Sequence, residues 1–281
     1  MFRTRILACV LLTAGSCAIF LLARPASQIP KESDNDAHVA PFARTRLRVD
    51  DHPSGHQLGM VKTDFDYAKY VEAQTTRNVQ GITNQFVKEE DIKFLADWMK
   101  RNVLSKEFGI CHGTRAGKEQ VWFQQHLEWM PGTVIGTEIS STANQFANTI
   151  QWDFHHVKDE WVGQVGFVYA NTLDHSYNPK LALSKWMECL DDSGVLLLEH
   201  CTAHAIDFKS DSDIFHASFG DYLALLLSIK DADVVEVLRS PVRWNQMACR
   251  IIVAVKRQSQ LNIIPAGRKK EPVMKKIEHR V

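Results

Sequence analysis

The chain has 281 residues, of which 45% are hydrophobic and 23% are charged. This composition is ordinary for a globular protein and excludes a collagen-like, low-complexity or wholly disordered chain. The 33 basic residues are balanced by 33 acidic residues, so the overall charge does not favour nucleic acid as a partner. Six cysteines lie far apart without a C-x-x-C pair, which excludes a cysteine-built zinc or redox motif.

The first 24 residues predict a targeting or anchoring segment. Residues 6–23 form a run of eighteen residues without a charge, about 27 Å long as a helix, which is enough to cross the hydrocarbon core of a bilayer. We favour an uncleaved membrane anchor, and cleavage after Ala18 as a secretory signal is the alternative. Arg3 and Arg5 precede the run and favour a cytoplasmic N-terminus with an exported body.

Three further segments complete the predicted organisation. Residues 25–61 are polar, include Pro30, Pro41 and Pro53, and lack sustained apolar periodicity, so they predict a flexible linker. Residues 62–256 are expected to form one folded domain with leading helices. Residues 257–281 are expected to form a disordered basic tail, since the chain from Lys256 onward has eight Lys or Arg against two Glu.

Hydrophobic periodicity and turn signals predict the elements of the folded domain. In chain order they are helices over 67–79 and 89–102, a strand over 108–111, a helix over 118–129, a strand over 133–138, a helix over 141–147, strands over 149–153 and 165–170, a helix over 179–190, a strand over 195–199, a helix over 214–228, and strands over 234–239 and 249–256.

This alternation of strands and helices with short connections is typical of a parallel sheet that is covered on both faces. Only nine residues separate the last two strands, which is too few for a helical crossover and therefore predicts a hairpin. We predict an α/β fold with a doubly wound, mostly parallel seven-stranded sheet and an antiparallel C-terminal hairpin.

Residues at three predicted strand ends indicate a nucleoside-shaped site, because ligands of open α/β sheets bind beyond the carboxyl ends of the strands. Gly113 and Gly117 bound a turn in which the backbone can pass close to a ligand. Glu138 ends the next strand and offers a carboxylate to both ribose hydroxyls. Asp153 ends the third strand, where a carboxylate can accept from an adenine amine. Each signal alone also fits a structural turn or a surface acid.

Over residues 86–256 the sequence resembles the class I S-adenosylmethionine-dependent methyltransferases, in particular the type-11 group of small-molecule enzymes. The run Gly113-Thr114-Arg115-Ala116-Gly117 stands in the place of the glycine-rich first motif, and Leu173-Asp174-His175 resembles the ending of the fourth strand. The resemblance implies a Rossmann-like fold, S-adenosyl-L-methionine as cofactor, and methyl transfer to a small-molecule acceptor. The cofactor-binding residues that it implies are Gly113, Arg115, Gly117, Glu138, Asp153 and Asn171.

The sequence departs from this family at the amino-acid end of the cofactor site. Arg115 replaces the usual middle glycine, and Cys111 stands near the place where many members have an acid. A catalytically silent, cofactor-binding interaction protein and an NAD-dependent oxidoreductase are the alternatives, although the first turn lacks a G-x-G-x-x-G pattern. Cys111 and Cys201 are interpreted as small buried residues at strand ends.

Histidines at two further strand ends are the candidate catalytic residues. His175 and His200 follow the predicted fourth and fifth strands, where a neutral imidazole could take a proton from a hydroxyl acceptor. A hydrogen-bonded scaffold role is an equal alternative for both. No metal site is predicted, because His200 and His204 lack a convincing third ligand. The leading helix, with Tyr67 and Tyr70, is expected to pack against the sheet rather than to cover the cofactor.

Overall fold

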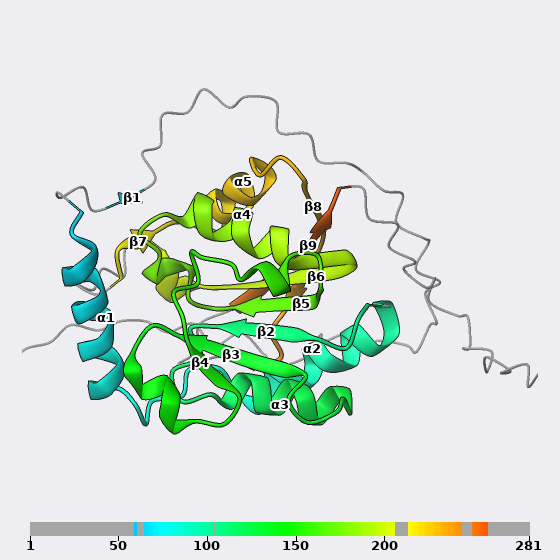
Figure 1. Ribbon diagram of the computed structural model, residues 1–281. Helices are drawn as coiled ribbons and strands as arrows, with labels where there is room; N and C mark the ends of the chain where they lie inside the picture. Colours follow the sequence, from blue (N-terminus) through cyan, green and yellow to red (C-terminus); the bar gives the residue numbers. More distant parts are fainter. Residues whose placement is uncertain (1–58, 61–64, 104, 206–212, 243–248, 258–281) are drawn as a thin grey trace, which may run out of the picture. The chain divides into compact units, whose positions relative to one another are not determined.

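The computed structural model describes residues 59–60, 65–103, 105–205, 213–242 and 249–257, which are built around a seven-stranded sheet of order β4-β3-β2-β5-β6-β9-β8 (Figure 1). Only β9 runs antiparallel to its neighbours, so the predicted α/β sheet and its terminal hairpin are confirmed. In chain order the strands are β2 (Gly109–His112), β3 (Val134–Glu138), β4 (Thr149–Gln151), β5 (Val165–Ala170), β6 (Leu190–Cys201), β8 (Ala232–Arg239) and β9 (Cys249–Lys256).

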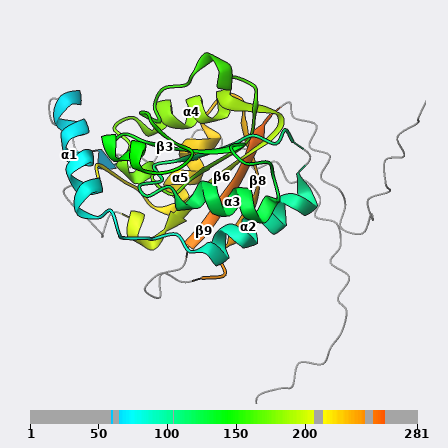
Figure 2. The same ribbon diagram turned by 60° about the horizontal axis from the view of Figure 1, so that its bottom comes forward.

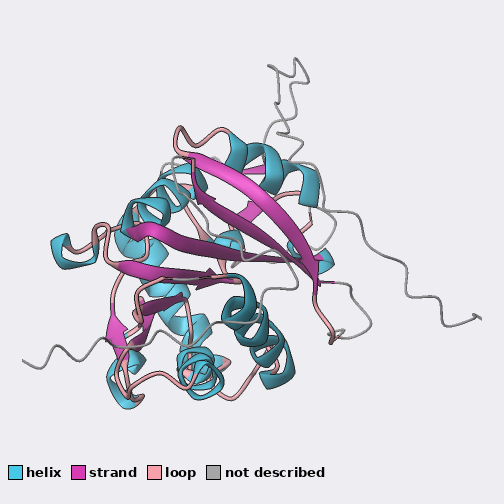
Figure 3. Ribbon diagram, turned by 90° about the vertical axis from the view of Figure 1, so that its right-hand side faces the viewer, coloured by secondary structure: helices cyan, strands magenta, loops and turns pink. Residues whose placement is uncertain are grey.

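Helices cover both faces of the twisted sheet (Figure 3). Figure 2 shows α2 and α3 side by side across one face, and α4 and α5 lie on the other face in Figure 1. The α-helices are α1 (Tyr67–Gln80), α2 (Glu89–Asn102), α3 (Lys118–Leu127), α4 (Pro179–Cys189) and α5 (Phe219–Leu227), and the short 3-10 helices are η1 (Ser141–Gln145), η2 (Asp159–Trp161), η3 (Leu173–His175) and η4 (Thr202–His204).

The apolar strand residues divide into two cores because successive side chains point to opposite faces of a sheet. Ile110 of β2 belongs to the core under α4 and α5, whereas the next residue, Cys111, belongs to the core under α2 and α3. Trp186 of α4 and Phe123 of α3 are both fully buried and fill the two cores. Burial on both faces explains why the central strands are continuous apolar runs in the sequence.

Two predicted helices are much shorter in the structure. The helix expected over 141–147 is only the 3-10 turn η1, which begins where the Ser140 side chain accepts from the backbone N–H of Thr142. The helix expected over 214–228 begins at Phe219, because Ser218 and Asp221 form a capping box there.

Before this helix, β7 (Phe215–His216) pairs antiparallel with β1 (Gly59–Met60). Residues 59–60, expected in the linker, therefore pair with the folded body. The expected anchor at residues 6–23, the rest of the linker up to residue 58 and the basic tail over 258–281 lie outside the described residues. Among the helices that the structure describes, none is both long enough and apolar enough to cross a membrane.

Candidate active site

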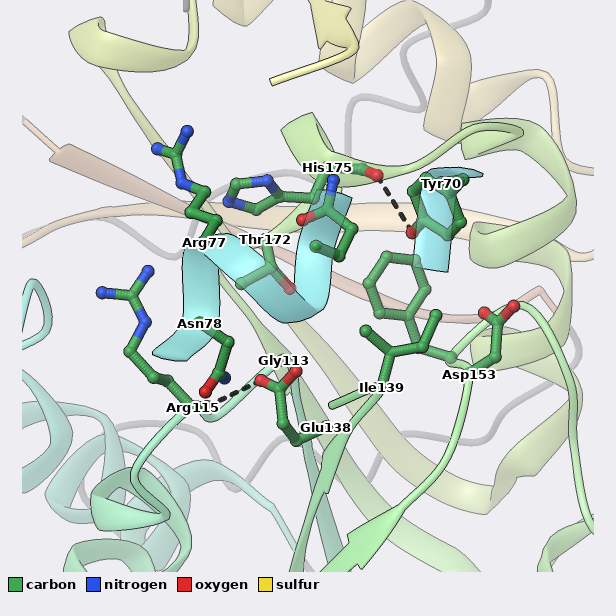
Figure 4. Close-up of a pocket in the computed structure, with 12 residues that line it drawn as sticks. Tyr70, Arg77, Asn78, Gly113, Arg115, Glu138, Ile139, Asp153, Thr172 and His175 are labelled. Atoms are coloured by element: carbon green, nitrogen blue, oxygen red, sulfur yellow. Dashed lines mark hydrogen bonds between the residues drawn. The ribbon is translucent and has the colours of Figure 1, made fainter. Parts of the chain in front are cut away.

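Two adjoining cavities lie beyond the carboxyl ends of the central strands, and Figure 4 shows the residues that line the first of them. The first cavity is bounded by the strand ends on one side and by α1 on the other. The second cavity, of about 470 Å³, shares five lining residues with the first, so the two are compartments of one cleft. The shared residues are Arg77, Gly113, Arg115, Thr172 and His175.

The turn after β2 depends on left-handed backbone conformations. Gly113 has a φ of 66°, and a Cβ at this residue would lie 2.6 Å from Oγ1 of Thr172, so only glycine fits. Gly117 has the same φ and is the N-cap residue that precedes α3, but it is not among the described residues that line the two cavities. The predicted glycine turn is therefore present, with Gly113 at the cleft and Gly117 shaping the turn behind it.

Arg115, the residue that replaces a family glycine, also adopts a left-handed conformation, with a φ of 46°. Such a conformation costs a non-glycine residue roughly 1 to 2 kcal/mol. The guanidinium offsets this cost because it donates to the carbonyl oxygens of Gly81 and Asn84, at 3.1 and 3.4 Å. Arg115 therefore joins the turn to the segment between α1 and α2 and lines both cavities.

Glu138 reaches the first cavity from the end of β3 and is 7% exposed. One carboxylate oxygen accepts from the backbone N–H of Arg115 at 3.1 Å (Figure 4). The other accepts from the backbone N–H of Ser140 at 3.0 Å. Each oxygen retains a second lone pair for a further donor. The carboxylate is thus fixed in orientation while it remains able to accept hydrogen bonds from a ligand.

Asp153, the predicted acid after β4, is held by residues from two directions. Oδ1 accepts from the backbone N–H of His155 and lies 2.6 Å from Nδ1 of its ring, and Oδ2 accepts from the hydroxyl of Tyr67 at 3.0 Å. Burial raises the pKa of Asp153, but the hydrogen bonds from His155 outweigh burial and hold that pKa below its usual value. Asp153 is therefore an ionised hydrogen-bond acceptor at neutral pH.

The leading helix α1, which the sequence predicts to pack against the sheet, also borders the first cavity. Tyr70, Gln74, Arg77 and Asn78 of α1 line the first cavity, and the Tyr70 hydroxyl donates to the carbonyl oxygen of His175 at 3.2 Å (Figure 4). This helix narrows the first cavity to about 60 Å³, whereas ligand pockets have roughly 300 Å³ or more. A nucleoside would therefore need more room than the first cavity alone provides.

The two candidate histidines occupy different environments. His175 lines both cavities, and its Nδ1 lies 3.3 Å from a carboxylate oxygen of Asp213. His200 is not among the described lining residues, and its Nε2 donates to the carbonyl oxygen of Ala217 at 3.0 Å. Burial lowers the pKa of His200 to about 4, which keeps the ring neutral. The geometry thus favours His175 for an acceptor-side role and a scaffold role for His200.

The second cavity contains carboxylates that the sequence interpretation missed. Burial raises the pKa of Glu119 and of Glu199 to about 7. Glu119 lies in the first turn of α3, where acids are common for helix-dipole reasons, so the sequence carries no specific signal for it. Glu199 lies near the carboxyl end of β6, and a position at a strand end was the sequence signal that could have identified it as a site residue. The predicted Asn171 and the acids Asp91, Glu119, Asp174, Glu199 and Asp213 line this cavity.

Cys201 is joined to Cys249 by a disulfide, which the sequence interpretation did not predict. The two residues face each other in the antiparallel pair of β6 and β9, and both line the second cavity. Cys111 is a fully buried free thiol, as expected for a small residue in a central strand.

Comparison with known proteins identifies the fold. No protein-family model and no curated protein matches the sequence. The crystal structure of Burkholderia thailandensis 1,6-didemethyltoxoflavin-N1-methyltransferase, with 1,6-didemethyltoxoflavin and S-adenosylhomocysteine bound, matches with a TM-score of 0.52 and 10% identity, over 70% of this chain and 93% of that chain. The chain has the class I methyltransferase fold.

A second structure of this fold is a single-residue variant of LepI in complex with S-adenosylhomocysteine and a substrate analogue. It matches with a TM-score of 0.52 and 12% identity, over 69% of this chain and 56% of that chain. The antiparallel C-terminal hairpin that the sequence predicts is present, and the predicted Rossmann-like methyltransferase fold is confirmed.

Proposed function

We propose that the chain binds S-adenosyl-L-methionine between α1 and the strand ends and transfers its methyl group to a small-molecule acceptor. The observation that carries this proposal is that the left-handed turn at Gly113 and the carboxylate of Glu138 line one cavity. A glycine turn permits close approach of a ligand, and an acid on the next strand suits ribose hydroxyls. The residues present therefore fit a nucleoside-containing cofactor, and both structural neighbours described above hold S-adenosylhomocysteine.

Different residues of the cleft would contact different parts of the cofactor. Glu138 would accept from the ribose, Asp153 from the adenine amine, and Gly113, Arg115 and Asn171 would lie toward the amino-acid end. When bound, S-adenosylmethionine supplies a methyl group on a sulfonium. The chain contributes alignment of the two reactants, which is the largest source of rate in such a displacement.

His175 would act on the acceptor. It lines both cavities and therefore lies where the cofactor site and the acceptor site adjoin. For a hydroxyl acceptor, a neutral imidazole at this position takes the proton that the oxygen loses, which contributes about 10² to 10⁴-fold to the rate. Asp213, 3.3 Å from Nδ1, would orient the ring and leave Nε2 as the base.

The alternatives make different predictions. The antiparallel β9 differs from the all-parallel order of the dinucleotide-binding fold, which weighs against an NAD-dependent oxidoreductase. A catalytically silent interaction protein would bind the cofactor without turnover.

Two measurements test the proposal. Titration calorimetry should show binding of S-adenosylmethionine and S-adenosylhomocysteine but not of NADH. Cells with and without the protein, fed isotopically methyl-labelled methionine, should differ in at least one labelled small molecule, which identifies the acceptor. Preferential binding of NADH, or cofactor binding without any labelled product, would contradict methyl transfer.

We also propose that residues 6–23 anchor the chain in a membrane as a single span with its N-terminus in the cytoplasm. The length of this uncharged run and the arginines before it, Arg3 and Arg5, support the proposal. A cleaved signal would instead release the body.

A further inference from the structure

We propose that His155 and Ser176 are positioning residues, which hold the Asp153 carboxylate as a hydrogen-bond acceptor and so make the site prefer a base with an exocyclic amine to one with a carbonyl. This inference rests on the proposed function, in which Asp153 would accept from the adenine amine. It deepens that proposal by assigning the base selectivity to two residues that are not among the described lining residues of either cavity.

A chain of hydrogen bonds leads from a backbone amide to the carboxylate of Asp153, which lines the first cavity (Figure 4). The backbone N–H of Asn178 donates to Oγ of Ser176 at 3.2 Å. This Oγ lies 2.7 Å from Nε2 of His155, and Nδ1 of the same ring lies 2.6 Å from Oδ1 of Asp153. The imidazole therefore connects the Ser176 hydroxyl to the carboxylate.

The two ends of this chain set the direction of every hydrogen bond in it. An ionised carboxylate only accepts, so Nδ1 of His155 carries the hydrogen. Burial lowers the pKa of His155 more than the nearby Asp153 raises it, so the ring is neutral at pH 7 and Nε2 is an acceptor. The Ser176 hydroxyl donates to Nε2, and the backbone N–H of Asn178 lies 3.4 Å from the same nitrogen as a second donor. All donors thus point toward Asp153.

The imidazole is also held in place by its surroundings. His155 and Ser176 are both 0% exposed. The ring of Tyr177 stacks on the imidazole, with centroids 3.6 Å apart and an angle of 25° between the planes. Hydrogen bonds that are shielded from water in this way are electrostatically stronger than exposed ones. The orientation of Asp153 is therefore set by a rigid, buried partner.

The arrangement leaves one oxygen of Asp153 for a ligand. Oδ1 accepts from both the backbone N–H and the ring of His155, at 2.9 and 2.6 Å, which uses its two lone pairs. Oδ2 accepts from the hydroxyl of Tyr67 and retains a further lone pair. An amine of a base would donate a charge-assisted hydrogen bond to this oxygen, whereas a carbonyl would bring a second acceptor against it.

Asp153, His155 and Ser176 also show the hydrogen-bond pattern of a serine hydrolase triad. However, a nucleophile must reach a substrate carbonyl, and Ser176 is fully buried with its Oγ accepting from Asn178. The geometry therefore favours a positioning role. Covalent labelling of Ser176 by a fluorophosphonate would overturn that assignment.

The test compares two ligands that differ in the base. The full chain is titrated by calorimetry with S-adenosylhomocysteine and with S-inosylhomocysteine, in which a carbonyl replaces the amine of the purine. We expect the adenine ligand to bind about ten or more times more tightly. Equal affinities, or a preference for S-inosylhomocysteine, would overturn the inference.

Three variants of the chain locate the effect. His155→Phe keeps a ring against Tyr177 but removes the donor, and it should lower the preference about tenfold. His155→Asn places an amide N–H where Nδ1 stood, and it should retain the preference within about twofold. Ser176→Ala removes one donor to Nε2 and should have a smaller effect than His155→Phe, because the backbone N–H of Asn178 remains.

The matched control is His126→Phe, which alters a histidine on α3 that pairs with Glu89 and should leave the preference unchanged. Both ligands share the ribose and the homocysteine, so a general loosening of the site would weaken both alike. Equal losses for the two ligands in His155→Phe would therefore make His155 a scaffold residue and overturn the inference.

The tautomer of His155 can be measured without any ligand, which also covers the case in which His155→Phe does not fold. Nitrogen chemical shifts of the full chain with ¹⁵N-labelled histidine, assigned with His155→Asn, should show a neutral ring with its hydrogen on Nδ1 at pH 7. A hydrogen on Nε2 alone would overturn the inference. Failure of S-adenosylhomocysteine to bind, with this tautomer present, would instead contradict the proposed function.

Discussion

The hydroxyl of Tyr67, in the first turn of α1, donates a 3.0 Å hydrogen bond to Oδ2 of Asp153, beyond the end of β4. Partial burial and the Asp153 carboxylate raise the pKa of Tyr67 to about 12, so the hydroxyl keeps its proton at neutral pH. The bond ties the covering helix to the strand end. It also engages the carboxylate that we propose for the adenine amine, so α1 and the cofactor would compete for Asp153.

Tyr67→Phe should therefore strengthen binding of S-adenosylhomocysteine. A net hydrogen bond is worth about 0.5 to 1.5 kcal/mol, which corresponds to roughly two- to tenfold in affinity by calorimetry. Tyr177→Phe is the matched control, since its hydroxyl lies 3.5 Å from the same oxygen and should matter less. Weaker binding by Tyr67→Phe would mean that the hydroxyl contacts the cofactor instead.

Glu138→Ala should weaken binding of S-adenosylhomocysteine by about 1 to 3 kcal/mol, because it removes a buried acceptor for ribose and loosens the turn at Arg115. Calorimetry on this variant is compared with Glu160→Ala, which alters an exposed acid on η2. Unchanged affinity in Glu138→Ala would show that the nucleoside does not bind in this cavity.

His175→Gln and His200→Gln should have different effects on turnover. The first should lower turnover of a hydroxyl acceptor by about 10² to 10⁴-fold with cofactor affinity within threefold, because it removes a base and not a nucleoside contact. The second should retain turnover and lose stability, since His200 packs against Tyr222 and donates to Ala217. Equal turnover in both variants from pH 6 to 9 would leave His175 a scaffold residue.

Glu119→Gln should change the pH dependence of stability. The pKa of Glu119 is about 7 in the folded chain, against 4.5 as its ordinary value. The folded chain thus binds this proton more tightly than the unfolded chain, and the resulting stability is present below pH 4.5 and is lost as the pH rises through 7.

Denaturant unfolding at pH 5 and pH 8 measures this effect. The free energy of unfolding of Glu119→Gln, relative to the unaltered chain, should rise by about 2 to 3 kcal/mol between these pH values. Glu160→Gln, at an exposed position, should show no such trend. A difference that does not change with pH would show that Glu119 ionises at its ordinary pKa.

The full chain should remain in the membrane pellet after alkaline carbonate extraction, because residues 6–23 are long enough to span the hydrocarbon core. A variant with Leu11→Lys, Ala14→Lys and Ile19→Lys should move to the supernatant, since charges at the centre of a span are costly. A mature N-terminus at Ile19 would instead establish a cleaved signal.

The sheet could be predicted because its strands are buried on both faces and separated by turn signals, and Glu138 and Asp153 could be placed because strand ends converge at one edge. The role of α1 could not be predicted in this way. The Tyr67–Asp153 contact joins residues 86 positions apart, and periodicity gives a helix its apolar face but not its partner. The Cys201–Cys249 pairing likewise depends on the register of β6 with β9, which no local pattern encodes.

The Cys201–Cys249 bridge has a consequence for the supply of the methyl donor. Such a bond persists in oxidising compartments and is rare in the cytosol, where thiols are kept reduced. Under the proposed anchoring, a body that retains this bond would work on the far side of the membrane. A charged sulfonium does not cross a bilayer unaided. Methylation there would depend on a carrier that imports the donor, and its rate would follow that import.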